Sequence, residues 1–364
     1  MKLNEITDCI EAYAPLTYQE SYDNAGLICG NPEMDITSAL ICLDSTEAII
    51  DEAIESGCNL VIAHHPIVFS GLKKLNGKNY VERVIIKAIQ NNIAIYAAHT
   101  NLDSVHNGVN AKIAEKLGLI NCQILAPQKN LLKKLITFCP EKNADEVRTA
   151  LFNAGAGNIA NYDECSFNTS GTGTFRAGAG SNPFVGEPGK QHQEKEVRIE
   201  TIYPQHIESQ LIKALLKVHP YEEVAYDLIP ITNKNNWVGA GLIGELPAET
   251  DEMNFLKTLK TNMKANSIRY TALREKKVKK VAICGGSGSF LLADAIKNGA
   301  DMFITADFKY HQFFDAENRI VIADIGHYEA EQFTMELFYE ILKKNFSTFA
   351  LLITKNNTNP IKYL

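Results

Sequence analysis

Short apolar runs alternate with amphipathic segments over the first third of the chain. Runs long enough for buried strands cover residues 38–43, 60–63 and 94–98. Apolar residues recur at helical spacing over residues 47–56, 80–91 and 107–117. Because the strands are almost continuously apolar and alternate with helices, the pattern predicts a buried, mostly parallel sheet.

The middle of the chain follows a different pattern. Strand-like runs cover residues 133–138, 162–176, 196–203 and 223–229, and helical spacing covers 143–154 and 207–217. Residues 178–193 have the composition of a loop. The order strand-helix-strand-strand-helix-strand is typical of a ferredoxin-like α+β sandwich. We therefore expect a self-contained domain inserted between two α/β segments.

The segments before and after this insert share a pattern at one constant offset. Ile41-Cys42 ends one apolar run and Ile283-Cys284 ends another, and the next runs end at His64-His65 and at Ala306-Asp307. Such a repeat predicts two related α/β lobes that form one metal-binding core. The expected domains are 1–128 for the first lobe, 129–233 for the ferredoxin-like insert, and 234–364 for the second lobe.

Composition narrows the possible functions. The 364 residues carry a formal net charge of -7, and no basic run exceeds Lys276-Lys277 or Lys279-Lys280, so we expect no nucleic-acid partner. The apolar runs are strand-sized and the N-terminus does not resemble a signal peptide, so we expect no membrane association. The eight cysteines are scattered singly, which is typical of a reducing compartment and predicts a cytoplasmic protein.

Side chains that can bind metal follow four predicted strands, at residues 60–63, 94–98, 302–305 and 320–323. These residues are His64 and His65; His99 and Asp103; Asp307 and His311; and Asp324, His327, Glu329 and Glu331. In open α/β sheets, sites lie at the carboxyl ends of the parallel strands. An isolated His-His pair, or a His and a Glu four residues apart, is by itself more often packing or a solvated pair. Their joint occurrence at strand ends of a repeated fold favours a shared site.

The residue types indicate the chemistry of that site. His327 and Glu331 are four residues apart at the start of a predicted helix and share one face. Imidazoles with carboxylates suit Zn²⁺, Mn²⁺, Fe²⁺ or Co²⁺ better than Ca²⁺ or Mg²⁺, and a carboxylate can bridge two ions. His99 and His311 remain open between outer ligand, hydrogen-bond partner of a ligand, and general base. The glycine-rich residues 284–289 lack the spacing of a phosphate-binding loop and equally fit a tight turn.

At these residues the chain resembles the NIF-three-like dinuclear metal-centre family, also called GTP cyclohydrolase type two homologues. The matching motifs are ESYDNAGLICG (20–30), AHHPIVFSGLKKL (63–75), AAHTNLDSVHNG (97–108), AICGGSG (282–288), ITADFKYHQ (304–312) and DIGHYEAE (324–331). They span both outer lobes. The insert resembles the PII-like domain of longer members through HPYEEVAYDL (219–228).

The resemblance implies five metal ligands, namely His64, His65, Asp103, His327 and Glu331. It also implies two divalent transition-metal ions per chain (Zn, Fe, Mn or Co) and a toroidal homohexamer. The reaction stays open. Our first hypothesis is a metal-dependent hydrolase of a nucleotide or similar small molecule, with His99 or His311 as proton carrier. The alternative is a metal- or metabolite-sensing regulatory protein without catalysis, in which the insert is the sensor.

Overall fold

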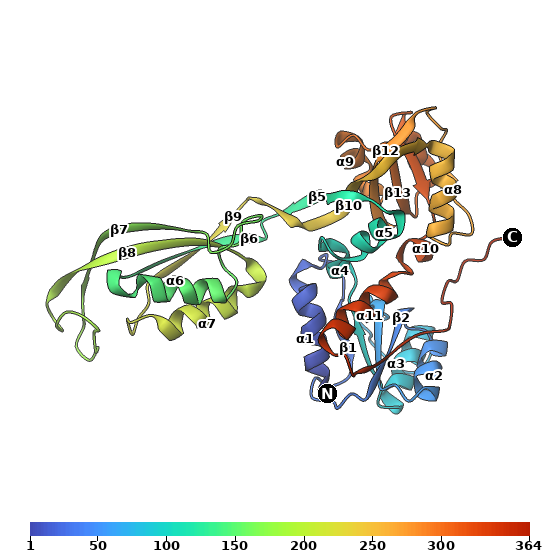
Figure 1. Cartoon of the computed structure of the whole chain (residues 1–364). Helices are drawn as coiled ribbons and strands as arrows, with labels where there is room; N and C mark the ends of the chain where they lie inside the picture. Colours follow the sequence, from blue (N-terminus) through green and yellow to red (C-terminus); the bar gives the residue numbers. More distant parts are fainter. The chain divides into compact units, whose positions relative to one another are not determined.

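The computed structural model describes residues 1–364 and divides the chain into two compact units (Figure 1). The core unit contains Met1–Pro127 and Trp237–Leu364, and the inserted unit contains Gln128–Asn236. The core unit holds two sheets and the inserted unit holds a third, so the fold is mixed α/β.

The first sheet of the core unit has five strands in the order β1-β4-β3-β2-β15. Their bounds are β1 (Gly26–Cys29), β2 (Ser38–Asp44), β3 (Leu60–His65), β4 (Ala94–Ala97) and β15 (Ala350–Ile353). The strands β15, β2, β3 and β4 are parallel, and β1 is antiparallel to β4. The prediction of a buried, mostly parallel sheet is thus confirmed here, since β2 to β4 are buried along almost their whole length.

Helices in the first half of the core unit begin where the sequence offers a cap. In α2 (Glu47–Glu55) the Thr46 hydroxyl accepts a hydrogen bond from the backbone of Ile49, and in α3 (Tyr80–Gln90) the Asn79 side chain accepts one from Glu82. The apolar faces of α2 and α3 join the buried cluster under the sheet. Three more helices are α1 (Leu3–Tyr13), α4 (Thr100–Ser104) and α5 (Val109–Leu117).

The second sheet of the core unit has six strands in the order β11-β14-β13-β12-β10-β5. Their bounds are β5 (Ile120–Lys129), β10 (Lys234–Asp251), β11 (Arg269–Tyr270), β12 (Lys277–Ser287), β13 (Met302–Ala306) and β14 (Val321–Asp324). The strands β12, β13 and β14 are parallel, while β10 runs antiparallel to β12 and β11 runs antiparallel to β14. The flanking helices are α8 (Glu252–Asn262) and α9 (Leu292–Lys297).

The last helical segment differs from the expected single helix. It consists of two helices, α10 (His327–Glu331) and α11 (Thr334–Asn345). Gly326 precedes α10 with φ +91°, a conformation that glycine adopts without strain, so the chain enters the helix two residues after β14. At the break, the Gln332 side chain donates to the carbonyl of Met263 and Phe333 is buried. The break therefore fastens α10 against the second half of the core unit.

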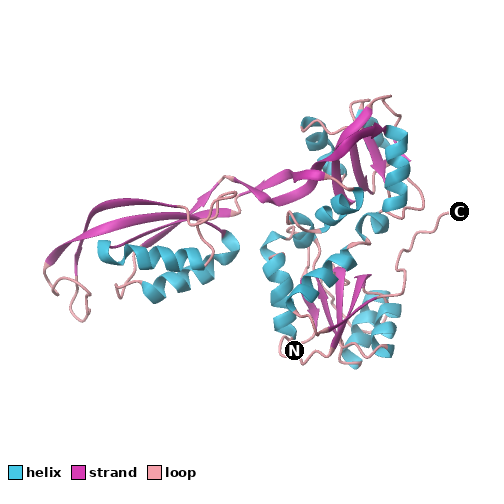
Figure 2. Ribbon diagram, in the orientation of Figure 1, coloured by secondary structure: helices cyan, strands magenta, loops and turns pink.

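The inserted unit is an antiparallel sheet in the order β7-β8-β6-β9 with two helices. Its elements are β6 (Leu132–Pro140), α6 (Ala144–Asn153), β7 (Ser166–Arg176), β8 (Gln191–Pro204), α7 (Glu208–Val218) and β9 (Tyr226–Ile231). Both helices lie on one face of the sheet (Figure 2) and share a buried core with it. The strand expected over residues 162–176 is β7, which begins at Ser166 and pairs with β8 along its whole length.

We compared the length and hydropathy of each helix with those needed to cross a membrane. No helix in the chain is both long enough and apolar enough to cross a bilayer.

Candidate metal centre

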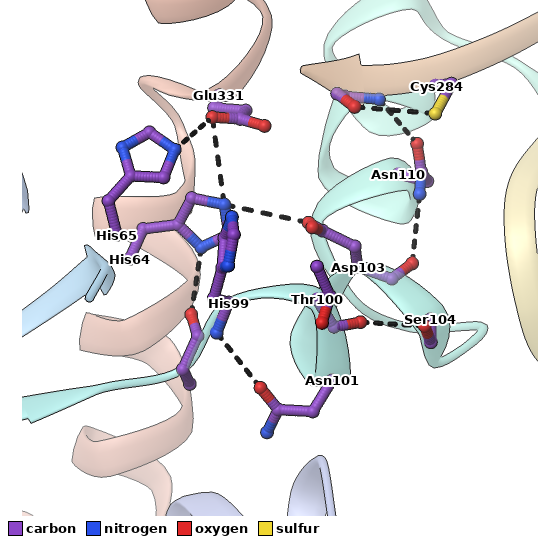
Figure 3. Close-up of polar contacts among 12 residues, drawn as sticks. His64, His65, His99, Thr100, Asn101, Asp103, Ser104, Asn110, Cys284 and Glu331 are labelled. Atoms are coloured by element: carbon purple, nitrogen blue, oxygen red, sulfur yellow. Dashed lines mark hydrogen bonds and ion pairs between the residues drawn. The ribbon is translucent and has the colours of Figure 1, made fainter. Parts of the chain in front are cut away.

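A cluster of imidazoles and carboxylates lies where strands of both sheets end. His64 and His65 are the last residues of β3, Asp103 lies on α4, and His327 and Glu331 are the two ends of α10. The Glu331 Oε2 atom lies 2.9 Å from His65 Nε2, 3.1 Å from His327 Nε2 and 3.7 Å from His64 Nε2. Figure 3 shows His64 between Glu331 and Asp103. The two adjacent histidines therefore reach the same carboxylate.

Two polar atoms in the cluster are buried without a hydrogen-bond partner. They are His64 Nε2 and Asp103 Oδ1, which lie 3.7 Å apart. A buried polar group left unsatisfied costs about 1–3 kcal/mol, and such groups are rare in folded proteins. An imidazole nitrogen and a carboxylate oxygen that face each other beyond hydrogen-bond distance are suitable ligands for a cation between them. The residues present thus fit a metal ion.

The other ring nitrogen of each histidine is held from outside the cluster. His64 Nδ1 contacts the carbonyl of Ala98 at 2.9 Å. His65 Nδ1 contacts Asp44 at 2.8 Å, and His327 Nδ1 contacts Asp307 at 2.7 Å. A carboxylate or carbonyl on Nδ1 fixes the ring orientation and directs Nε2 inward, as is common around metal-binding histidines.

The three histidines have different pKa values, because burial and neighbouring carboxylates act on each of them to a different extent. Burial lowers the pKa of His64 to about 4, so its Nε2 carries a free lone pair. For His65 and His327 burial also lowers the pKa, but nearby carboxylates outweigh it. Hydrogen bonds to Asp44 and Glu331 raise the pKa of His65 to about 9. The charge of Glu331 and the hydrogen bond to Asp307 raise the pKa of His327 to about 11.

The two inner carboxylates shift in opposite directions. Burial and the charge of Glu331 raise the pKa of Asp103 well above its usual range. Burial also disfavours the charged form of Glu331, but His327 and His64 outweigh it and hold its pKa well below the usual range. Without a metal, the cluster therefore relies on protonated imidazoles to balance its carboxylates, a balance that a cation can supply instead.

Three overlapping groups have their ligand atoms within 4.8 Å of one another. They are His64, Asp103 and Glu331; His65, His327 and Glu331; and His64, His65 and His99. Glu331 belongs to two of the three groups. Nitrogen and oxygen donors in such mixtures suit divalent transition metals.

Glycine at position 286 makes room for Glu331. Gly286 has φ +62°, and a Cβ at this position would lie 2.3 Å from Glu331 Oε1. The neighbouring Gly285 N–H donates to Asn110 Oδ1 (2.9 Å), whose amide nitrogen donates to the carbonyl of Asp103 (3.0 Å). The glycine-rich segment thus ties the second half of the core unit to the first and leaves space for the shared carboxylate.

His99 lies beside the cluster and has a buried partner of its own. Its ring centre is 5.3 Å from those of both His64 and His65. Its Nδ1 contacts Asp23 Oδ1 at 2.8 Å, and the other Asp23 oxygen accepts from the backbone and hydroxyl of Thr100. Burial disfavours the Asp23 carboxylate, but the hydrogen bonds from His99 and Thr100 outweigh it and lower its pKa to about 2. Asp23 is therefore an acceptor, so His99 Nδ1 donates and His99 Nε2 is left free.

A cavity of about 450 Å³ opens at this side of the cluster. His99, Asp103, His327 and Glu331 line it, together with the exposed rings of Tyr22 and Phe290. Its size falls in the range of small-molecule sites.

The structure does not bring His311 to the cluster. His311 is exposed, and its contacts are with the rings of Tyr310 and Phe314. A catalytic role for His311 stays a prediction, without support from its contacts within the chain. Two residues to which the sequence analysis assigned no role are Asp23 and Asp44. Asp44 ends β2 directly beside His65, so the strand-end rule could have included it.

The mixed α/β fold and the clustered His, Asp and Glu side chains define a protein with a candidate metal centre. The chain belongs to the Duf34/NIF3 (NGG1p interacting factor 3) family, whose model matches residues 1–360. It is 37% identical over 366 residues to the GTP cyclohydrolase 1 type 2 homolog of Bacillus subtilis (strain 168), covering 99% of this chain and 98% of the relative. The chain is also 37% identical, with the same coverage, to the GTP cyclohydrolase 1 type 2 homolog of Halalkalibacterium halodurans.

A solved structure agrees with this assignment. The Bacillus cereus protein related to NIF3 superposes with a TM-score of 0.87 at 37% identity, covering 100% of this chain and 99% of that one.

Proposed function

We propose that the core unit binds two divalent transition-metal ions (Zn, Fe, Mn or Co) and is a metal-dependent hydrolase of a nucleotide or similar small molecule. His64, Asp103 and Glu331 would hold one ion, and His65, His327 and Glu331 the other. The observation that carries the proposal is the facing pair of buried, unpartnered atoms, His64 Nε2 and Asp103 Oδ1.

Bound ions of this kind polarise substrate oxygens and lower the pKa of water. The chain itself supplies the proton transfer. His99 Nδ1 is committed to Asp23, so His99 Nε2 can accept a proton at the cavity and release it again. Asp44 and Asp307 hold the rings of His65 and His327 while this happens. If His99 is instead a metal ligand, as the third group allows, another group must carry the proton.

The residues that line the cavity beside the cluster favour a small planar substrate. Tyr22 and Phe290 offer aromatic surfaces at its rim, and the metal-binding side chains lie in the same lining. A nucleotide fits this combination because its base can stack while its oxygens face the metal site. Two relatives are named as homologs of a GTP cyclohydrolase, which places GTP first among the compounds to be tested.

The experiment is a turnover screen of metal-loaded protein against GTP, other nucleotides, phosphodiesters and cyclic amides. Wild type and Glu331→Gln are run in parallel, because the variant keeps the side-chain size and loses the shared carboxylate. Hydrolysis by wild type alone would support the proposal. Equal hydrolysis by both would indicate a contaminant. No turnover at full metal content would favour the regulatory metal-binding protein.

We also propose the domain division 1–128, 129–233 and 234–364, with two related lobes around a ferredoxin-like, PII-like insert. The parallel strands β2, β3, β4 and β12, β13, β14 occupy equivalent places in the two lobes, which supports the repeat. The chain order strand-helix-strand-strand-helix-strand and the sheet order β7-β8-β6-β9 support the ferredoxin-like topology.

We also propose that the protein forms a homohexamer and is cytoplasmic. The family resemblance supports a toroidal homohexamer, which light scattering of the purified protein would test. All eight cysteines are free, which supports a cytoplasmic location.

A further inference from the structure

The inserted unit contains a cavity of about 690 Å³, and every residue that lines it belongs to that unit. Its walls come from Phe138 on β6, from β7, from β8, and from the segments around residues 177–184 and 221–225. The volume lies within the range of sites for drug-sized or nucleoside-sized molecules.

The cavity lies over the face of the sheet that the helices leave uncovered. Val197 and Ile199 on β8 belong to the core shared with α6 and α7. Glu196 and Arg198 alternate with them along β8, so their side chains point to the opposite face, and both line the cavity. Figure 2 shows both helices on the other side of this sheet.

A nearly buried carboxylate faces this cavity with one oxygen unused. Glu196 is 9% exposed and accepts a hydrogen bond from the Tyr221 hydroxyl through Oε1 (2.6 Å). Burial and Glu196 raise the pKa of Tyr221, so the hydroxyl stays protonated and donates. Glu196 Oε2 has no hydrogen bond and the side chain forms no ion pair. This oxygen is a hydrogen-bond acceptor that the protein leaves without a donor, so it marks a place for a ligand that brings one.

Glycine at position 173 is needed for this arrangement. A Cβ there would lie 2.1 Å from Glu196 Oε2. Because Gly173 has no side chain, the carboxylate can lie against β7 and still reach the cavity. The nearby cation of Arg198 does not neutralise Glu196, since its guanidinium pairs with Glu200 at 2.9 Å.

Aromatic rings form the wall next to the carboxylate. The ring centre of Tyr221 lies 6.2 Å from that of Phe175 and 6.3 Å from that of Phe184. The loop that carries Phe184 is held in place, because the Glu222 carboxylate accepts a hydrogen bond from the Asn182 backbone (3.0 Å). Rings at these distances offer stacking surfaces for a flat group.

We propose that this cavity binds a small molecule with a flat, amino-bearing heterocycle of the nucleobase type. Glu196 Oε2 accepts its N–H group, and Phe175, Phe184 and Tyr221 stack on its ring. The site is separate from the metal cluster, which shares no residue with it. The inserted unit is then a ligand-binding module whatever reaction the core unit performs.

The test is isothermal titration of the full-length, metal-loaded protein with guanosine, adenosine and purine riboside. The first two carry an exocyclic amino group, and purine riboside lacks it. We expect guanosine or adenosine to bind at least about tenfold more tightly than purine riboside, because a hydrogen bond to a charged group contributes about 1.5–3 kcal/mol. Glu196→Gln should weaken that binding by at least about tenfold.

Two further variants separate a ligand site from general damage. Phe184 is 46% exposed, so Phe184→Leu leaves the core of the unit intact and should weaken binding severalfold. Glu194→Gln is the matched control, because Glu194 lies on β8 two residues from Glu196, contacts His192 and does not line the cavity. It should bind like wild type.

Glu331→Gln distinguishes this site from the cavity of the metal cluster. If it loses metal but keeps nucleoside binding, the inserted unit holds the ligand even if the proposed hydrolase fails. The inference is overturned if no nucleoside binds below millimolar concentration, if Glu196→Gln binds as well as wild type, or if binding disappears in Glu331→Gln. It is likewise overturned if a second copy of the chain closes the cavity in solution, as protection of residues 169–176 from hydrogen exchange on assembly would show.

Discussion

The Nε2 atom of His64 is fully buried and lies 3.7 Å from Oε2 of Glu331, without a hydrogen bond to it or to any other group. The same Glu331 oxygen is within 3.1 Å of His65 Nε2 and His327 Nε2. The Glu331 carboxylate therefore lies next to His64 on one side and to His65 and His327 on the other, so its removal affects both groups.

We predict that Glu331→Gln removes both ions, whereas His64→Ala removes one more strongly than the other. The reason is that Glu331 belongs to both proposed groups and His64 is paired with Asp103 in one of them. Metal per chain, measured by elemental analysis after reloading, should approach two in wild type and zero in Glu331→Gln. Glu336→Gln is the control, since Glu336 pairs with Lys116 on the surface. Two ions in Glu331→Gln would refute a shared carboxylate.

Asp44→Asn should lower metal affinity without removing a ligand. Asp44 holds His65 Nδ1 at 2.8 Å, and loss of such an orienting carboxylate typically reduces affinity 10- to 100-fold. Competition with a chromophoric chelator measures the change. Asp35→Asn is the matched control because the exposed Asp35 side chain pairs only with Lys2, away from the cluster. Equal affinity in Asp44→Asn and Asp35→Asn would mean that Asp44 does not orient His65.

The side chains that form the cluster were predictable because they follow strands. His64 and His65 end an apolar run, and the spacing of His327 and Glu331 places both on one helical face. The residues that hold the rings were harder to assign. Asp307 was recognised as a residue that can bind metal, yet its contact with His327 Nδ1 depends on the φ of +58° that turns the chain after β13. Asp23 contacts His99 from a loop, and loops have no hydrophobic periodicity from which such a contact could be predicted.

The fold was predictable to a similar degree. Apolar runs located β2, β3 and β4, and the order of elements in the insert agreed with β6 to β9. The break between α10 and α11 could not be predicted from the sequence, because the hydrophobic spacing continues through Phe333. The break depends on a hydrogen bond from Gln332 to Met263, which lies far away in the sequence. Local pattern identifies elements, but tertiary hydrogen bonds decide where they are interrupted.

The metal-free protein should lose stability as the pH rises from about 6.5 to 9. The folded-state pKa of His65 is about 9, above its ordinary value of 6.5. Its contribution to stability is therefore complete below pH 6.5 and is lost as the pH passes through 9, at most about 3 kcal/mol for this residue. Urea unfolding at several pH values measures the trend. Metal-loaded protein should show the opposite trend, because ions bind neutral imidazole. If stability depended on pH in the same way with and without metal, His65 would not be a metal ligand.

Replacing residues 129–233 by a short Gly/Ser linker should leave the metal content of the core unit unchanged. None of the five proposed ligands lies in this segment, and β5 and β10, which lead into and out of it, are neighbours in one sheet. Inserts whose ends lie close together are tolerated at such places. Elemental analysis and circular dichroism of the deletion variant check the prediction. A folded variant that binds no metal would show that the insert contributes to the site.

His99→Gln should keep both ions and lose most turnover. The Asp23 carboxylate fixes His99 Nδ1, so the role available to the free Nε2 is proton transfer at the cavity. A proton carrier in this place contributes about a hundredfold or more to the rate. Asp23→Asn should reduce turnover in the same direction, because an amide can present either its oxygen or its nitrogen to the ring and no longer fixes the tautomer. Metal content and rate are measured on the same preparations, with the substrate that the turnover screen identifies. Loss of an ion in His99→Gln would instead make His99 a ligand, as the group of His64, His65 and His99 allows.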